Sequence, residues 1–521
     1  MSDSKARDSV TPSGASRREL RDYYERKDRK RTRLAATLIA SALVVLFAGA
    51  LFINSGVIRR SFTAMVVGST KYSAVDFNYF YQQAFSNYQN VVYQNMSDLA
   101  TSMLPNTSKP HKSQIYDEET GETWAEFISS MAVSTLEELT VLYEDAMRNN
   151  YSLPDDMRQK LDEEIESLRS TASMYGMSSL NKYLTSMFGP GMNEKEFRRL
   201  AEMTYIGDAY SEYKRNEFTY TDAQLNEYYE SKKDSLDTFT YRYFLYSADM
   251  PDEDSFADDD AYEEARQSAV DAAGAQAAEL LAGISDEQAF TDAAAEYDPA
   301  TYTGDDSTKR VYMGELLGSI YGPWLRDGAR KYGDVTTIEA NNGHYLVFFI
   351  DRSDNDYPTV DMRQLLVSIE TVNAEDYAED ETDEAYNAAV EQAAFDAQTK
   401  AESLYGEWGD ADFTDEKLLE LIPGNSGDSA ENGLYENVYK LQLDAAVNDW
   451  LFDPGRAPGD HELIESDAGF HLVYFTGQAE AYRDHLADTR KRDEDFNAWK
   501  EGLGTLESQR RWAYRFAMEI Y

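Results

Sequence analysis

The stretches GHYLVFF at residues 343–349 and GFHLVYF at residues 469–475 are nearly the same sequence. Each follows a second matching stretch, YRYFLYS at 241–247 and MRQLLVS at 362–368, so the chain repeats itself with a period of about 120 residues. All four runs have the aromatic, aliphatic and β-branched composition of buried strands. A repeat of this length predicts one small domain that occurs twice.

The two copies differ in the position of their histidine. His344 directly follows the glycine of the first copy, whereas His471 comes one residue later in the second. Because successive side chains of a strand point to opposite faces, this offset predicts that the two imidazoles lie on opposite sides of equivalent strands. We therefore expect the copies to be chemically different.

Both copies show the same order of predicted elements. Each has a strand, an acidic loop, a long helix, a second helix, a turn with glycine, a further helix and a final strand. The first copy covers residues 237–354, with its long helix at 261–281, and the second covers 355–478, with its long helix at 385–408. This order predicts an α+β domain with a small, mainly antiparallel sheet.

The N-terminal region has the pattern of a membrane anchor. Residues 34–53 carry no charge, are rich in aliphatic side chains, and are long enough to span a bilayer as a helix. The leader before them, residues 1–33, is rich in Arg and Lys, which favours a cytoplasmic N-terminus and export of everything after Ile53. We therefore predict a single-pass protein of the cell membrane. A cleaved signal peptide is the alternative, although the apolar run exceeds the ~7–15 residues of a usual signal core.

The exported part is strongly acidic. The formal net charge is −47, and the first 60 residues carry 13 Lys and Arg against 6 Asp and Glu, which leaves −54 for the remaining 461 residues. Such a surface repels phosphates and argues against nucleic acid as a partner. The chain has no cysteine, which excludes disulfides, thiolate catalysis and cysteine-ligated zinc. The sequence HELIE at 461–465 lacks the second histidine of a metalloprotease motif, and we predict no metal and no cofactor.

Residues 61–236 form a predicted helical block behind one hairpin. Residues 65–72 alternate like strands, and Ser73 with Asp76 forms a capping box that opens a long aromatic helix. We expect helices alone after this hairpin, and their periodicity covers 124–149, 154–174, 178–188 and 193–216.

Eleven of the sixteen methionines lie in this helical block. Flexible thioethers favour a surface that adapts to varied apolar partners, and filling of a helical core is the alternative. Residues 479–521 are predicted to be helical, and we expect their aromatic and basic end to dock back onto the acidic body.

The second copy resembles the parvulin class of peptidyl-prolyl isomerases. The resemblance rests on Asn432-Gly433-Leu434-Tyr435, on Leu441-Gln442-Leu443, on Pro458-Gly459-Asp460 and on Gly469-Phe470-His471-Leu472. The helical block is similar to the chaperone domain that precedes parvulin domains in SurA- and PrsA-like exported foldases. The resemblance implies an α+β multidomain protein with one transmembrane helix, a SurA-N-like helical domain, two parvulin-like domains and a C-terminal helix.

The resemblance also implies a site in the second copy. Parvulins have two histidines on neighbouring strands beneath the bound proline, beside an Asp or Cys. Here His471 matches the second histidine, Gln364 stands at the position of the first, and Asp428 is the candidate for the acidic member. Because Gln can form hydrogen bonds but cannot titrate, we expect any isomerase activity to be reduced and confined to this copy.

A Met and a Phe line the proline pocket of the family. Leu443 and Val447 stand in their place, and together with Phe452 they are expected to bind the prolyl ring. In the first copy, Tyr243 and Tyr345 occupy the two histidine positions. We expect that copy to be catalytically inert and to keep a binding or structural role.

Three functions are compatible with these features. The first is a membrane-anchored extracytoplasmic foldase that binds unfolded exported polypeptides and isomerises their X-Pro bonds, which interconvert slowly without a catalyst. The second is a holdase chaperone whose parvulin-like domains bind peptide without catalysis. The third is a scaffold for an envelope assembly. The sequence leaves the oligomeric state open.

Overall fold

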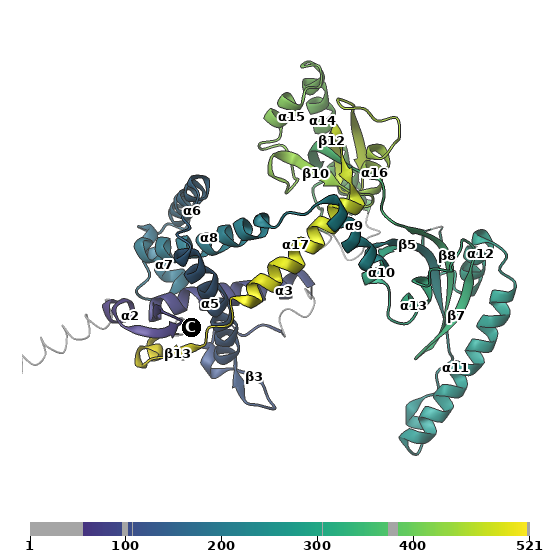
Figure 1. The fold of residues 1–521 in the computed structure, drawn as a ribbon, viewed down its shortest axis with the longest axis horizontal. Coiled ribbons are helices and arrows are strands. Elements are labelled where there is room, and N and C mark those ends of the chain that lie inside the picture. Colours follow the sequence, from purple (N-terminus) through teal and green to yellow (C-terminus); the bar gives the residue numbers. More distant parts are fainter. Residues whose placement is uncertain (1–55, 96–102, 107, 305, 374–383, 518–521) are drawn as a thin grey trace, which may run out of the picture. The chain divides into compact units, whose positions relative to one another are not determined.

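The computed structural model describes residues 56–95, 103–106, 108–304, 306–373 and 384–517 (Figure 1). The predicted leader and the predicted membrane segment, residues 34–53, lie outside these ranges. Within them, no helix combines the length and the apolar character needed to cross a bilayer. The membrane anchor therefore stays a prediction.

The described chain divides into two compact units. The helical unit contains residues 56–218 and 495–517, and the sheet unit contains residues 219–494. The predicted boundary at residue 236 differs from this division, because α9 (Asp222–Ser231) and α10 (Lys233–Leu236) belong to the sheet unit. Tyr229 of α9 is fully buried there and shares an apolar cluster with Tyr482.

The helical unit begins with a short helix and a hairpin and continues mainly with helices. Its elements are α2 (Val57–Ser61), β1 (Thr63–Val67), β2 (Thr70–Ser73), α3 (Ala74–Asn95), η2 (His111–Ser113), β3 (Ile115–Asp117), β4 (Glu122–Thr123), α5 (Trp124–Arg148), α6 (Asp155–Met174), α7 (Leu180–Phe188), α8 (Glu194–Glu217), β13 (Ser508–Arg510) and η7 (Trp512–Phe516). The antiparallel pair β3–β4 corrects the expectation of helices alone after the first hairpin. Asp117 stabilises the turn between them, because its carboxylate accepts a hydrogen bond from the Glu119 N–H at 2.8 Å.

The predicted capping box fixes the start of α3. The Ser73 N–H donates to Asp76 Oδ2 at 2.8 Å, and the Asp76 N–H donates to Ser73 Oγ at 3.3 Å. Behind this cap, α3 buries Phe77, Phe80 and Tyr81 in the core of the helical unit. The aromatic side chains of this helix therefore supply much of the apolar area that holds the unit together.

The C-terminal segment returns to the helical unit as a strand. β13 pairs antiparallel with β1, Met65 opposite Arg510, and gives a sheet of order β13-β1-β2. The following turn buries Ala513 and places the ring of Tyr514 edge-on to Phe77, with 4.9 Å between the ring centroids. The expected docking is therefore observed, but the prediction of helix throughout residues 479–521 is wrong.

The sheet unit contains two copies of one α+β fold. The first copy consists of β5 (Thr238–Ser247), η3 (Glu253–Ser255), α11 (Asp259–Ala282), α12 (Glu287–Tyr297), β6 (Lys309–Met313), η4 (Gly314–Leu316), α13 (Gly322–Leu325), β7 (Val335–Ala340) and β8 (Gly343–Ser353). The second consists of β9 (Pro358–Ser368), α14 (Glu384–Gly409), α15 (Asp415–Leu421), η6 (Glu431–Gly433), β10 (Leu434–Val438), α16 (Ala445–Leu451), β11 (His461–Ser466) and β12 (Gly469–Ala481), and α17 (Tyr482–Gly502) follows it.

The two sheets have the same topology. Their strand orders are β6-β5-β8-β7 and β10-β9-β12-β11, all antiparallel. The central strands also pair in the same register, because Tyr243 lies opposite Val347 and Gln364 lies opposite Val473. The duplication seen in the sequence is therefore a duplication of structure. The edge strands β6 and β10, which follow the second helix of each copy, were not predicted.

A buried arginine repeats between the copies. Nε of Arg242 on β5 lies 2.7 Å from Glu287 at the start of α12, and Nε of Arg363 on β9 lies 2.6 Å from Asp415 at the start of α15. Both arginines are buried. Each pair ties the second helix of its copy to the central strand, and an acidic residue in the first turn of a helix also suits the helix dipole.

Candidate functional site

The structure brings the three predicted catalytic residues of the second copy together. Gln364 on β9 and His471 on β12 lie on the same face of the sheet, and Asp428 lies in the loop between α15 and η6. The carboxamide of Gln364 stands between the other two side chains. Its Oε1 is 3.1 Å from His471 Nδ1, and its Nε2 is 2.5 Å from Asp428 Oδ2.

Two further side chains complete this hydrogen-bonded chain. Ser466 Oγ, at the end of β11, is 2.9 Å from His471 Nε2, and the hydroxyl of Tyr435 on β10 donates to Asp428 Oδ1 at 2.7 Å. Sequence reasoning missed both as site residues. Tyr435 is part of the glycine-turn motif, and Ser466 precedes the turn that leads into β12. Their positions beside the two central strands were the feature of the sequence from which both could have been predicted as site residues.

The hydrogen bonds determine the tautomer of His471. The NH2 group of Gln364 donates to Asp428, so the Gln364 side-chain oxygen, which can only accept, faces His471. Nδ1 of His471 must therefore carry the proton and donate it to Gln364, and Nε2 accepts from the Ser466 hydroxyl. The site holds a neutral imidazole with both nitrogens occupied.

Burial sets the ionisation of this site. Only 5% of His471 and 4% of Gln364 is exposed. Burial lowers the pKa of His471 below its usual 6.5, and the carboxylates of Asp444 and Asp428 oppose this shift. Burial, together with the hydrogen bond to Asp428, raises the pKa of Tyr435 to about 12. At neutral pH the imidazole is therefore uncharged and can orient neighbouring groups, but it offers no positive charge to a substrate.

The three predicted proline-binding residues lie beside α16. Val447 is completely buried in the apolar cluster between α16 and the sheet, and Leu443 and Phe452 pack on the margin of that cluster, half-buried. Val447 thus has no surface left for a ligand in this conformation, whereas Leu443 and Phe452 keep part of theirs. Leu441, two residues before Leu443, is the most exposed apolar side chain of this loop.

The first copy has aromatic rings where the second has the hydrogen-bonded chain. Tyr243 and Tyr345 occupy the positions of Gln364 and His471, with 5.8 Å between their ring centroids. Tyr321 packs against both rings at 5.4 Å. This arrangement contains no imidazole, which agrees with the expectation that the first copy is chemically different.

His344 lies on the other face of the first sheet, as the one-residue offset predicts. It packs against Gly274 of α11, where a Cβ would come within 2.5 Å of Nε2. Neither ring nitrogen has a hydrogen-bond partner among the described residues, although both are buried. His344 is therefore separated from the tyrosine cluster and serves packing in the observed state.

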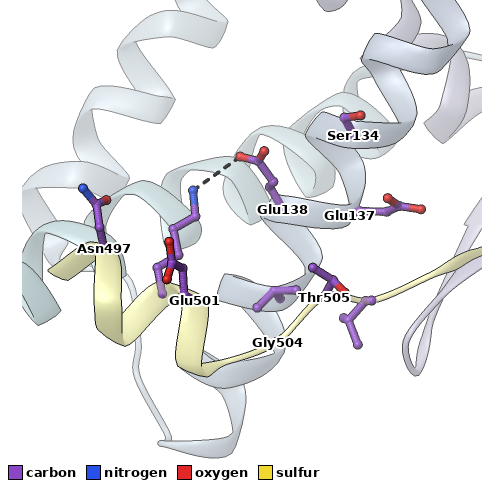
Figure 2. A pocket seen from close by; sticks show the side chains of 10 residues that line it. Ser134, Glu137, Glu138, Asn497, Glu501, Gly504 and Thr505 are labelled. Carbon is purple, nitrogen blue, oxygen red and sulfur yellow. Dashed lines mark hydrogen bonds and ion pairs between the residues drawn. The ribbon is translucent and has the colours of Figure 1, made fainter. Parts of the chain in front are cut away.

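A cavity of about 610 Å³ lies inside the helical unit, between α5 and the end of α17 (Figure 2). Its walls carry the carboxylates of Glu137, Glu138 and Glu501. Lys500 Nζ forms an ion pair with Glu138 at 3.4 Å, and Glu137 accepts a hydrogen bond from the Ser508 N–H at 2.8 Å. Two of these carboxylates therefore hold the C-terminal segment against α5.

No protein-family model matches this chain, and no curated protein matches it. Among solved structures, it is similar to PrsA from Bacillus subtilis at 16% identity over 53% of this chain and 88% of that chain, with a TM-score of 0.16. It is also similar to a structure from Campylobacter jejuni whose description names the SurA-like chaperones PEB4 and Cj1289, at 16% identity over 41% of this chain and 78% of that chain, with a TM-score of 0.16. A third is foldase protein PrsA from Lactococcus lactis, at 12% identity over 71% of this chain and 96% of that chain, with a TM-score of 0.20. At TM-scores this low, the function has to be inferred from the residues of this chain itself.

Proposed function

We propose that this chain is an extracytoplasmic foldase, anchored in the cell membrane by residues 34–53, whose main activity is to bind unfolded exported polypeptides. The observation that carries this proposal is an exposed apolar patch at the end of α6 and on α7. We call it the α6–α7 patch: Met174, Tyr175 and Met187 are exposed, and Met177 and Tyr183 belong to it as half-buried side chains.

The α6–α7 patch presents large apolar side chains to solvent. Met174 is 82% exposed and Tyr175 72% exposed, and the Tyr175 ring stacks on Tyr183 with 6.2 Å between centroids. Methionine adapts its shape to different partners, and tyrosine adds a rigid ring with a polar tip. A patch of this composition suits the transient binding of varied apolar segments. Met203, by contrast, is buried in the core, so the methionines of this unit are divided between the core and the surface.

The client-binding proposal is tested by light scattering from thermally denatured citrate synthase mixed with the full chain in lipid nanodiscs. We expect the wild-type chain to suppress aggregation and the Met174→Ser/Tyr175→Ser variant to lose most of this effect. Tyr332→Ser, which removes an exposed ring from the sheet unit, is the matched control and should behave as wild type. A wild-type chain that does not suppress aggregation would refute client binding. A double variant that still suppresses it would place the binding surface elsewhere.

The absence of cysteine gives a direct test of location. Single cysteines introduced as Ser4→Cys and Ser268→Cys are treated in intact cells with a membrane-impermeant maleimide. We expect labelling at position 268 alone, because the basic leader should keep position 4 in the cytoplasm. Labelling at position 4 would overturn the predicted orientation.

A second candidate function is prolyl isomerisation in the second copy. The chain of hydrogen bonds from Asp428 through Gln364 to His471 favours it, because these residues stand at the positions that the parvulin resemblance assigns to catalysis. The reaction needs no covalent step, since a shaped apolar pocket that twists and desolvates the amide lowers its barrier. The buried, neutral imidazole and Gln364 in place of histidine predict weak turnover.

Isomerisation of a proline tetrapeptide by the full chain tests this second function. We expect low activity in the wild-type chain, a further loss in His471→Ala, and an increase of about tenfold in Gln364→His, which is less than the ~10²–10⁴-fold that a positioned acid–base group usually contributes. If neither the wild-type chain nor Gln364→His exceeds the uncatalysed rate, the second copy is a binding module.

A further inference from the structure

We propose that a cleft between the two copies of the sheet unit binds an extended apolar segment of a client polypeptide that carries an acidic residue, and that this segment adds a strand to the free edge of β6. The proposal rests on the client-binding function above and names a second binding site for it. The cleft has a volume of about 540 Å³. We call it the β6 cleft.

The floor of the β6 cleft is one face of the first sheet. Thr240 on β5, Val311 on β6 and Asp351 on β8 are neighbours across three adjacent strands and line the cleft together. Tyr312 also lines it. Because Val311 and Tyr312 point to opposite faces of β6, a cavity that touches both must include the edge of the strand itself.

The outer edge of β6 has backbone groups free for pairing. β6 is an edge strand, and its ladder with β5 includes the bonds from the Gly314 N–H to Asp237 O at 2.9 Å and from the Tyr243 N–H to Thr308 O at 2.9 Å. In an antiparallel ladder the bonded pairs alternate, so the N–H and C=O groups of Val311 and Met313 point away from β5. Such an edge is a template for an added strand.

The opposite wall of the cleft is aromatic and belongs to the second copy and to the start of α17. The rings of Tyr439 and Tyr482 are stacked with 4.6 Å between their centroids, and Tyr357 lies 5.6 Å from Tyr482. The Tyr357 hydroxyl accepts a hydrogen bond from the Lys440 N–H at 3.2 Å, which holds the loop after β10 against this wall. Side chains of an added strand would therefore meet rigid aromatic surfaces.

Leu441, which lines the cleft, is held in a strained conformation. Its φ of +68° lies in the left-handed region, which is costly for a bulky side chain. The Leu441 N–H donates to Asn448 Oδ1 at 2.7 Å, and this bond fixes the conformation. In this conformation the Leu441 side chain is 58% exposed. An apolar ligand would cover it.

The charges of the β6 cleft differ from those of the rest of the chain. Lys309 and Lys440 line it with Asp351, so the cleft is net positive in a chain with a formal net charge of −47. Lys440 lies over the Tyr357 ring, 4.6 Å from its centroid, and Lys309 is exposed beside the strand edge. This charge favours a segment with an acidic side chain over a basic one.

The experiment uses the full chain in nanodiscs and two fluorescein-labelled peptides of alternating valine and tyrosine, one ending in two aspartates and one in two lysines. Fluorescence anisotropy gives the Kd of each. We expect Val311→Pro to raise the Kd of the acidic peptide at least about tenfold, because proline removes an outward N–H without breaking the hydrogen bonds between β6 and β5. Lys309→Glu should raise the Kd of the acidic peptide and lower the Kd of the basic one.

Thr337→Pro is the matched control. Thr337 lies on β7, at the opposite edge of the same sheet. The Phe349 N–H donates to Asp334 O, and the Gly333 N–H donates to Phe349 O. Residues bonded to β8 alternate along β7 from Asp334 onward, so the Thr337 N–H also points outward. We expect the Thr337→Pro variant to bind the acidic peptide with the same Kd as the wild-type chain. Circular dichroism should show that both proline variants are folded.

Three outcomes overturn the proposal. Equal Kd values for Val311→Pro and Thr337→Pro would exclude strand addition at β6. If the wild-type chain binds no peptide but forms a concentration-dependent dimer that Val311→Pro abolishes, the edge of β6 binds another molecule of this protein. A wild-type chain that suppresses aggregation of citrate synthase but binds neither peptide would remove the β6 cleft and leave the α6–α7 patch. A wild-type chain that binds peptide at β6 but suppresses no aggregation would instead count against the foldase function.

Discussion

Gly274 of α11 leaves the space that the imidazole of His344 on β8 occupies. A Cβ at position 274 would lie 2.5 Å from Nε2 and 2.8 Å from Cε1 of that ring. Glycine inside a helix costs about 1 kcal/mol relative to alanine, so the close contact gives a reason for its presence.

Gly274→Ala is therefore expected to destabilise the chain despite the better helix propensity of alanine. Overpacking a closed site costs about 1–3 kcal/mol, which exceeds the gain in propensity. His344→Ala removes the ring, so the double variant Gly274→Ala/His344→Ala should be more stable than Gly274→Ala alone. Urea unfolding followed by circular dichroism measures these free energies. A Gly274→Ala variant at least as stable as wild type would show that the ring can move aside.

His471 should make the stability of the chain depend on pH below neutrality. Burial lowers the pKa of His471 in the folded state, whereas the unfolded chain should titrate near 6.5. Well above pH 6.5 both states are neutral at this residue and its contribution is constant. As the pH falls below 6.5, the unfolded state binds a proton first, so stability is lost by up to about 1.4 kcal/mol per pH unit until the folded pKa is reached.

The comparison with His471→Gln isolates this effect, because glutamine cannot titrate and all carboxylates are retained. Urea-unfolding free energies from pH 7.5 to 5 should fall more steeply for the wild-type chain than for the variant. Parallel curves would mean that the imidazole keeps its usual pKa in the fold.

Tyr514 should hold the C-terminal segment on the helical unit. Its ring lies edge-on to Phe77 at 4.9 Å, and it packs on the core of the unit. Tyr514→Ala is expected to lower the unfolding free energy by about 2–4 kcal/mol, as for other large-to-small changes in a core. Thermal unfolding by calorimetry measures the loss.

Trp512→Ala is the control for that substitution. Trp512 lies on the same turn but is mostly exposed, so its removal should cost less than about 1 kcal/mol. Equal effects of the two substitutions would mean that β13, and not the half-buried Tyr514 ring, fixes the segment.

The features that depend on local pattern could be predicted from the amino-acid sequence. The repeat, the long helices, the capping box of Ser73 and Asp76, and the opposite faces of His344 and His471 all follow from periodicities of 2 or 3.6 residues and from hydrogen bonds between near neighbours. The structure reproduces each of them.

The pairing of distant segments became known only from the folded chain. β13 joins β1 from the far end of the chain, β6 and β10 are too short to show a period, and Ser466 and Tyr435 reach the site because their strands pair with the two central ones. Whether His471 is open or buried was also decided there, since exposure depends on what α16 and the neighbouring loops place over the sheet. Strand pairing and burial depend on contacts between residues far apart in sequence, and the sequence pattern of one segment does not identify the segment that it contacts.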